Sequence, residues 1–399
     1  LGYLSGVTSA IQTQLNAKVS SSALNVTGIV VQTAPSTFAG RSIAGTTNQI
    51  TVSNGNGISA NPTISLPTQI QVDQSGASRG VNSIDFQSSR SDGFQVASGA
   101  RSFVAGGLNN TTSGTASFAC GLGNTASGNY SACVNASNQA LGSYAFASGT
   151  TSRAVGDAST AMGDECIANG TASHAEGHQT VAGLSGSGVA AHAEGHATVA
   201  RGNGSHSQGF ADYDNGYDVY GVIDAVGTGS FAGGYTGSND GAYGTIQASG
   251  TGSTALGTAE SDSSISSSGP GSLALGCVAN ESDLVANNNG AVCLGYFSNS
   301  SNGSATGLGA FVRASCDNGG TATASGDGSC IMIYSDAGQS ATAAGNGAMI
   351  VGSPQANMQA DGTAAFLHGI GGTANQENQY VHGTTSFQYN RFVLNASGS

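Results

Sequence analysis

The chain has 399 residues, of which 64 are glycine and 5 proline, with no tryptophan and only 8% charged residues. So few large apolar side chains argue against a thick hydrophobic core, and so little charge and proline argue against disorder. The net charge of −13 argues against nucleic acid as a partner, because such binding needs a basic face, and no apolar run is long enough to predict membrane insertion. This composition is typical of a thin, repetitive fold.

Residues 1–20 are expected to form a short coiled-coil segment. Their apolar positions follow a 3-4-3 spacing, the pattern of a coiled-coil seam: Leu4, Val7, Ile11 and Gln14. An ordinary amphipathic helix has the same spacing, so both interpretations stay open. A coiled coil this short would need partner chains for stability.

Residues 21–95 are expected to form a strand-rich fibre shaft. Apolar and polar residues alternate around Val52 and around Ile64, and the Asn-Gly pairs of residues 54–57 lie between them. Asn-Gly is the strongest short-range signal for a hairpin. The pattern predicts short strands that have no core of their own.

A seven-residue repeat begins at Ser117 and gives the clearest structural signal in the chain. The windows SFACG, NTASG, SACVN, NQALG, AFASG, SRAVG, STAMG, CIANG and SHAEG have Ala at the third place, except Cys133, and Gly at the fifth, except Asn135. Glycine at this frequency disfavours helix, and a spacing of two is the period of a strand. Two strands and two turns therefore predict a stacked 14-residue coil, with the odd places on a face of small side chains.

Later windows keep this pattern with insertions. They begin at residues 191, 198, 205, 230, 253, 272, 291 and 305. Residues 96–355 are thus expected to form a β-roll with loop insertions, and residues 356–399 a C-terminal β cap. Because the small-residue face looks too thin to bury a core within one chain, we expect a homotrimer. The seven cysteines lack CxxC spacing and are interpreted as buried free thiols.

Two groups of phrases resemble known families. The S-x-A-x-G windows resemble the YadA-like β-roll head of trimeric autotransporter adhesins. YLSGVTSAIQTQLNAK, ITVSNGNGISANPTISLP and the SHAEG and AHAEG windows are similar to phrases of phage and large-virus tail fibres. These resemblances imply a mostly β homotrimeric fibre with a left-handed β-roll or β-solenoid. FVLNASGS resembles the stretch before the self-cleaving chaperone of tail spikes, which makes Ser399 a candidate processing end.

Two clusters contain residue types that bind metals. On a strand, His174, Glu176 and His178 share one face, and the second cluster repeats them as His192, Glu194 and His196. Around a threefold axis such residues would form rings suited to zinc or nickel. The competing interpretation is that they are ordinary polar residues on the outside of the coils. His206 and Gln208 fill the same places without a metal-like set.

The insertion after Phe210 is the candidate receptor-binding loop. Asp212, Asp214 and Asp218 have the alternate spacing of a calcium loop but lack its twelfth-position Glu. A solvated acidic loop is the competing interpretation of these three residues. The loop also carries three aromatic residues suited to stacking on sugars: Tyr213, Tyr217 and Tyr220.

The predicted function is a structural virion fibre or spike protein that attaches to a host cell surface through glycans. Its N-terminus would join other tail, baseplate or capsid proteins, and its location would be the virion or an extracellular surface. The first alternative is a cell-surface trimeric adhesin or an extracellular filament protein. The second is a polysaccharide-degrading tail spike. No enzyme is expected beyond self-cleavage by a removed chaperone, and no cofactor is required beyond the candidate metal ion or Ca²⁺.

Overall fold

The computed structural model describes residues 10–11, 13, 27–34, 37–45, 50–65, 75–184, 188–212, 221–239, 242–335, 338–377, 379–382 and 390–392. The chain divides into two units, Leu1–Asp73 and Gln74–Ser399, and each is described by itself. Most of the coiled-coil segment expected at residues 1–20 lies outside the described residues. No helix in the described part of the chain is long and apolar enough to cross a membrane.

The first unit contains two short antiparallel pairs. Strand β1 (Ile29–Ala34) pairs with β2 (Thr37–Arg41), and β3 (Thr51–Ser53) pairs with β4 (Thr63–Ser65). In the second pair Val52 lies opposite Ile64, as the alternation around the Asn-Gly pairs predicts. Ile64 is 60% exposed, so this pair has no core of its own within the unit.

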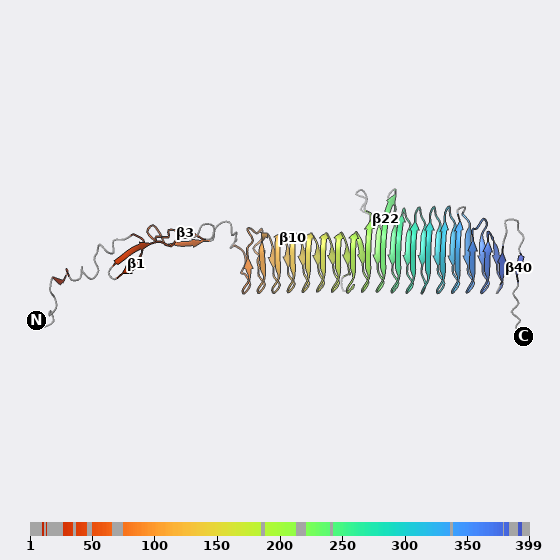
Figure 1. Cartoon of the computed structure of the whole chain (residues 1–399), viewed down its shortest axis with the longest axis horizontal. Coiled ribbons are helices and arrows are strands. Elements are labelled where there is room, and N and C mark those ends of the chain that lie inside the picture. The colour runs from red at the N-terminus through yellow and green to blue at the C-terminus, as the bar shows by residue number, and fades with distance from the viewer. Residues whose placement is uncertain are drawn as a thin grey trace, which may run out of the picture. The chain divides into compact units, whose positions relative to one another are not determined.

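The second unit is a stack of parallel coils that fits a β-solenoid (Figure 1). Each full coil gives a longer strand to one sheet and a shorter strand to another. The long-strand sheet contains β5 (Ile84–Asp85), β6 (Phe103–Leu108), β8 (Phe118–Leu122), β10 (Ala132–Ala136), β12 (Phe146–Thr150), β14 (Thr160–Asp164), β16 (His174–His178), β18 (His192–His196), β20 (His206–Ala211), β22 (Phe231–Asn239), β25 (Thr254–Glu260), β27 (Leu273–Val278), β29 (Val292–Phe297), β31 (Phe311–Cys316), β33 (Cys330–Ser335), β35 (Met349–Gly352), β37 (Phe366–Gly369) and β39 (Tyr380–His382). Two short strands pair antiparallel at its margins: β23 (Ala242–Tyr243) with β22, and β40 (Asn390–Phe392) with β39.

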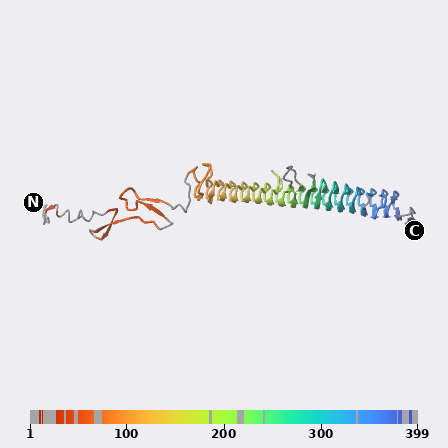
Figure 2. The same ribbon diagram turned by 90° about the horizontal axis from the view of Figure 1, so that it is seen from above.

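The short-strand sheet closes the other side of each coil. It contains β7 (Thr111–Thr112), β9 (Thr125–Ala126), β11 (Gln139–Ala140), β13 (Arg153–Ala154), β15 (Ile167–Ala168), β17 (Val181–Ala182), β19 (Thr198–Ala200), β21 (Val222–Ala225), β24 (Thr245–Ala248), β26 (Ser264–Ser267), β28 (Asp283–Ala286), β30 (Asn302–Ala305), β32 (Thr321–Ala324), β34 (Ser340–Ala343), β36 (Met358–Ala360) and β38 (Gly372–Ala374). Figure 2, turned by 90°, shows the coils following one another in chain order.

The first part of the stack has the predicted 14-residue coil. Phe118 lies opposite Ala132, which lies opposite Phe146. The third-place alanines point inward and are fully buried, as Ala119 and Ala126 are. The expectation that this face is too thin to bury a core within one chain is therefore wrong. Small side chains let the two sheets approach closely, so one chain covers the face by itself.

A repeated turn explains the Gly and Ser of the sequence pattern. The Ser131 hydroxyl donates to the Gly128 carbonyl at 2.7 Å, and Ser173 donates to Gly170 at 2.6 Å. The residue before each serine has a positive φ, 59° at Tyr130 for example. The fifth-place glycines on the long strands have another reason: Gly163 has a φ of +129°, and a Cβ there would overlap the Gly177 carbonyl oxygen.

A ladder of buried asparagines links successive 14-residue coils. The Asn124 backbone N–H donates to Oδ1 of Asn110 at 3.0 Å, and the Asn138 N–H donates to Oδ1 of Asn124 at 3.0 Å. The Asn124 amide also donates to the carbonyls of Cys120 and Asn135, both at 2.8 Å. Because alanine burial supplies little hydrophobic energy per coil, these satisfied polar groups carry much of the specificity.

The later coils are longer, and they correct the expected register. Val292 lies opposite Phe311, nineteen residues on, so the residue equivalent to Ala291 is Ala310 and not Ala305. Ala305 instead ends β30. Compared with the early coils, the long strand gains one residue, the connection after it gains two and the short strand gains two. All five additions lie at one rim, which rises from β22 onward in Figure 1 while the other rim stays level.

The additions create a wider core. Each 19-residue coil has an extra inward position on both strands, and in several coils a large side chain fills it. Ile265 and Leu284 are fully buried there, as are Ile331 and Ile350 elsewhere in this part of the stack. Hydrophobic burial per coil is therefore larger than in the alanine-lined part.

The stack extends past both boundaries that the repeat predicts. It includes β5 before residue 96, and after residue 355 it continues through β36 to β39 by parallel pairing. The turn after β36 lacks the serine signal, since Ala365 takes its place and its N–H donates to the Gly362 carbonyl at 3.1 Å.

The cysteines carry no disulfide. All seven are free, and Cys133, Cys166, Cys293 and Cys316 are buried, as interpreted from the sequence. Cys120 and Cys330 are half-buried, and Cys277 is exposed, which differs from that interpretation.

Candidate functional site

Three consecutive coils place a cluster of ionisable residues on the outer face of the long-strand sheet. The strands are β16, β18 and β20, and their parallel register aligns like residues in columns. One column is His174, His192 and His206, and the next is Glu176, Glu194 and Gln208. Residues two apart on a strand face the same side, so the two columns are neighbours. We call His174, Glu176, His192, Glu194 and His206 the His-Glu cluster.

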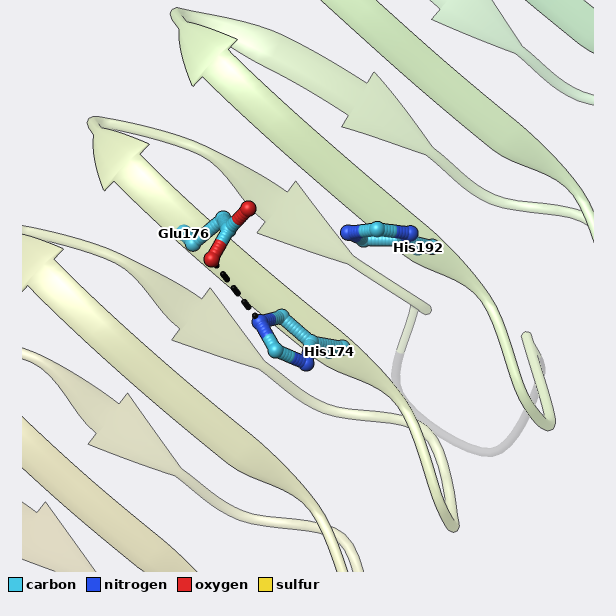
Figure 3. Close-up of side chains that lie close together, drawn as sticks. All are labelled: His174, Glu176 and His192. Atoms are coloured by element: carbon cyan, nitrogen blue, oxygen red, sulfur yellow. Dashed lines mark hydrogen bonds and ion pairs between the residues drawn. The ribbon is translucent and has the colours of Figure 1, made fainter.

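The cluster contains two overlapping triads. In the first, one ligand atom each from His174, Glu176 and His192 lies within 4.8 Å of the others. Figure 3 shows His174 and Glu176 joined on one strand, at 3.3 Å between Nε2 and Oε2, with His192 on the adjacent strand. The second triad is His192, Glu194 and His206, with the same 4.8 Å limit.

Contacts inside the second triad centre on the Glu194 carboxylate. Its Oε1 lies 3.4 Å from Nε2 of His206, and its Oε2 lies 4.0 Å from Nε2 of His192. The imidazole rings of these two histidines stack with centroids 4.6 Å apart. Nε2 of each is buried and has no hydrogen-bond partner. Neither nitrogen atom therefore makes a hydrogen bond, although Nε2 of His206 lies within ion-pair distance of Glu194.

Burial lowers the pKa of His192 below its ordinary value. The neighbouring His206 and His174 lower it further, while Glu194 and Glu176 oppose the shift. The imidazole is consequently neutral near pH 7, which is the form that binds a metal.

The structure regroups the histidines predicted from the sequence. His178 and His196 stack on each other in a separate column, with centroids 4.8 Å apart. Nε2 of His178 lies 3.4 Å from the Asp164 carboxylate, and Nδ1 of His196 hydrogen-bonds to the Ala211 carbonyl at 2.7 Å. The predicted clusters lay within single strands, whereas the triads cross between coils. His206 joins through the 14-residue step from His192, a signal that the sequence contains.

A shallow groove of about 740 Å³ adjoins the cluster. Glu176, Glu194 and Gln208 line it, together with the fifth-place glycines Gly163, Gly177, Gly195 and Gly209. The absence of side chains on these glycines leaves backbone along the groove. A ligand bound at the cluster would therefore be open to solvent on that side.

The candidate receptor-binding loop lies mostly outside the described residues. Five of the predicted residues of the loop are not among the described residues: Tyr213, Asp214, Tyr217, Asp218 and Tyr220. The candidate processing end, Ser399, also lies outside the described residues. Asp212 is described: its N–H donates to the Thr236 carbonyl at 2.8 Å, and its carbonyl accepts from Gly221 at 3.2 Å. The loop thus leaves β20 and returns beside β21 at the rim where the coils lengthen.

A second groove, of about 570 Å³, lies on the same sheet in the 19-residue coils. Tyr296 and Tyr334 line it and are 50% and 56% exposed, and Arg313 lies on the strand between them. Arg313 is the sole lysine or arginine between Arg201 and Arg391 in the sequence, and this isolation is the signal that marks it.

Comparison of the chain with protein-family models and with curated proteins gave no match. Imidazole and carboxylate groups can bind a divalent transition metal. The aromatic and apolar side chains of the same face can pack against another macromolecule.

Proposed function

We propose that the chain is a homotrimeric virion fibre or spike protein that attaches to a host cell surface, with glycans as the receptor. The supporting observation is the unequal chemistry of the two outer faces of the stack. On the long-strand sheet the outward residues of the later coils are mainly apolar: Phe231, Leu256, Leu273, Leu275, Val292, Leu294, Phe311, Met332, Met349 and Val351. We call these residues the apolar face.

The short-strand sheet has the opposite character. Its outward residues in the same coils are mainly polar: Thr245, Gln247, Ser264, Ser266, Asp283, Asn302, Ser304, Thr321, Thr323, Ser340 and Thr342. Both sheets share one solenoid, so the contrast does not come from the fold. Large apolar patches on soluble proteins generally mark an interaction site.

Copies of the same chain fit the apolar face. The face continues coil after coil, so a parallel copy presents the same residues at the same 4.7–4.9 Å strand spacing. Closed rotational symmetry covers the face on every copy, and the adhesin-like repeat supports three copies. The polar short-strand sheet and the rim loops would then face solvent, where a receptor can reach them.

Matched substitutions on the two faces test this assembly. Leu275, on the apolar face, is 43% exposed, and Ser266 is its counterpart on the polar face. Leu275→Asp should reduce the mass measured by light scattering from that of a trimer to that of a monomer, whereas Ser266→Asp should keep the trimer. A monodisperse wild-type monomer would overturn the assembly.

Attachment needs a separate experiment, because assembly alone also fits an adhesin or a filament. The wild-type chain should bind cells or arrayed glycans, and Tyr213→Ala with Tyr217→Ala should lose this binding while the melting temperature stays unchanged. If binding survives and the trimer weakens, the loop is structural. Release of new reducing ends from a bound polysaccharide would favour the degrading tail spike.

A further inference from the structure

We propose that the His-Glu cluster binds one divalent transition metal ion per chain, with Zn²⁺ and Ni²⁺ as the favoured ions. The site is formed within a single chain, from strands β16, β18 and β20. The inference therefore does not depend on the proposed function or on the number of chains in the assembly.

The ligand atoms already converge. Zinc binds His nitrogen at about 2.0–2.1 Å and carboxylate oxygen at about 2.0–2.2 Å, so two ligands of a tetrahedral ion lie roughly 3.3 Å apart. The three ligand atoms of each triad lie within 4.8 Å of one another before any ion is bound. Rotation of the imidazole and carboxylate groups would close the remaining gap, which is at most about 1.5 Å for any pair of ligand atoms.

The scaffold limits competing arrangements. Parallel pairing fixes Ala175, between His174 and Glu176, opposite Ala193, and both alanines are fully buried. The outward residues on either side are thus held at a constant coil spacing. Such a preformed backbone lowers the ordering cost of binding.

Two buried nitrogen atoms without hydrogen bonds give a second, independent observation. A buried polar atom without a hydrogen bond is costly, so native structures usually provide it with one. Nε2 of His192 and Nε2 of His206 have no hydrogen bond, and the second lies 3.4 Å from Oε1 of Glu194. A metal ion between Glu194 and these nitrogens would satisfy both at once.

The stoichiometry follows from His192, which belongs to both triads. A neutral imidazole has one lone pair and binds one ion, so full occupation of one triad excludes the other. Three protein ligands leave a coordination position open, and the groove beside Glu194 supplies water to it. The site therefore resembles an open metal site more than a closed structural one.

Titration of the metal-stripped full chain with Zn²⁺, and separately with Ni²⁺, tests the proposal by calorimetry. One ion per chain is expected. His192→Ala, which breaks both triads, should weaken binding by about 100-fold or more, since even second-shell changes cost 10–100-fold. His178→Ala is the matched control, because it removes a histidine of the same sheet face from the neighbouring column. Circular dichroism and the melting temperature verify that both variants stay folded.

Three outcomes decide the assignment. Absence of binding for both ions overturns it, and so does equal weakening by His178→Ala and His192→Ala, which would indicate adventitious binding to exposed imidazoles. Glu176→Gln and Glu194→Gln then identify the occupied triad, because only the carboxylate of that triad should matter. If neither substitution weakens binding, the carboxylate-containing site is wrong.

Discussion

The ring of Phe297 occupies the space that a Cβ on Gly303 would need. Phe297 ends β29, and Gly303 lies on β30 in the same coil, on the opposite sheet. In the preceding coil these two positions hold Val278 and Leu284. A large residue on one sheet is therefore matched by a small one on the other, and the exchange keeps the inner layer filled without overlap.

This relationship predicts a strongly non-additive pair of substitutions. Gly303→Leu alone should destabilise the chain by at least ~3 kcal/mol, because it overpacks a filled layer. Phe297→Val alone should cost ~2–4 kcal/mol through the cavity that it leaves. The double variant recreates the Val278 and Leu284 pair and should recover most of the loss. Urea unfolding of all four proteins gives the coupling energy, and additive losses would contradict the packing.

The asparagine ladder predicts a second stability effect. Asn124→Ala leaves the Asn138 N–H without its acceptor and removes both N–H donors that bind the Cys120 and Asn135 carbonyls, and should cost about 2–4 kcal/mol. Asn124→Ser should cost less, because Ser152 fills the equivalent place and both donates to Gly163 and accepts from Cys166.

Asn129→Ala is the control for the ladder. Its Oδ1 accepts from the Thr115 N–H at 2.9 Å, but the residue is exposed, so water can replace the bond. Thermal unfolding should rank Asn124→Ala as the least stable of the three. Equal melting temperatures for Asn124→Ala and Asn129→Ala would show that the ladder contributes nothing.

The sequence predicts the early coils well because their pattern has a direct steric cause. Alanine at the third place and glycine at the fifth mark positions such as Ala161 and Gly163, where the opposite sheet or the next coil leaves no room. Later coils share the Gly-rich turn, but the added residues lie at the far rim. The spacing of Ala and Gly alone therefore predicts Ala305 as the equivalent of Ala291. In the structure Ala305 lies at the end of a short strand.

Four residues of the His-Glu cluster were predicted as ligands, whereas His206 was not, and the structure groups the residues differently. Reasoning along one strand pairs His174 with His178, which a spacing of four places on the same face. The parallel register instead makes His192 the nearer partner of His174, with ring centroids 4.9 Å apart. The pairing of His174 with His192 can be predicted only when the length of the coil between β16 and β18 is known. This coil is four residues longer than the 14-residue repeat.

The cysteines predict a labelling order. Burial raises the pKa of Cys133, Cys293 and Cys316 to about 12, so roughly one thiol in 10⁴ is ionised at pH 8. Cys277 is exposed and should react first with iodoacetamide in the native protein. Mass spectrometry of peptides after timed labelling provides the order, and denatured protein is the control in which all seven should react. Modification of Cys293 before Cys277 would contradict the burial.

The small-residue positions provide the last prediction, from substitutions at Ala161 and Gly163 and one substitution on the outer face. Ala161 is fully buried between Ala147 and Ala175 of the adjacent coils, so Ala161→Leu adds bulk where none fits and should cost ~1–3 kcal/mol or more. Gly163→Val should be worse, because the positive φ and the Gly177 carbonyl both oppose a side chain. Thr160→Val keeps its volume on the outer face and should change stability by no more than ~0.5 kcal/mol. Differential unfolding in urea separates the three variants, and equal midpoints would mean that the inward and outward faces are assigned wrongly.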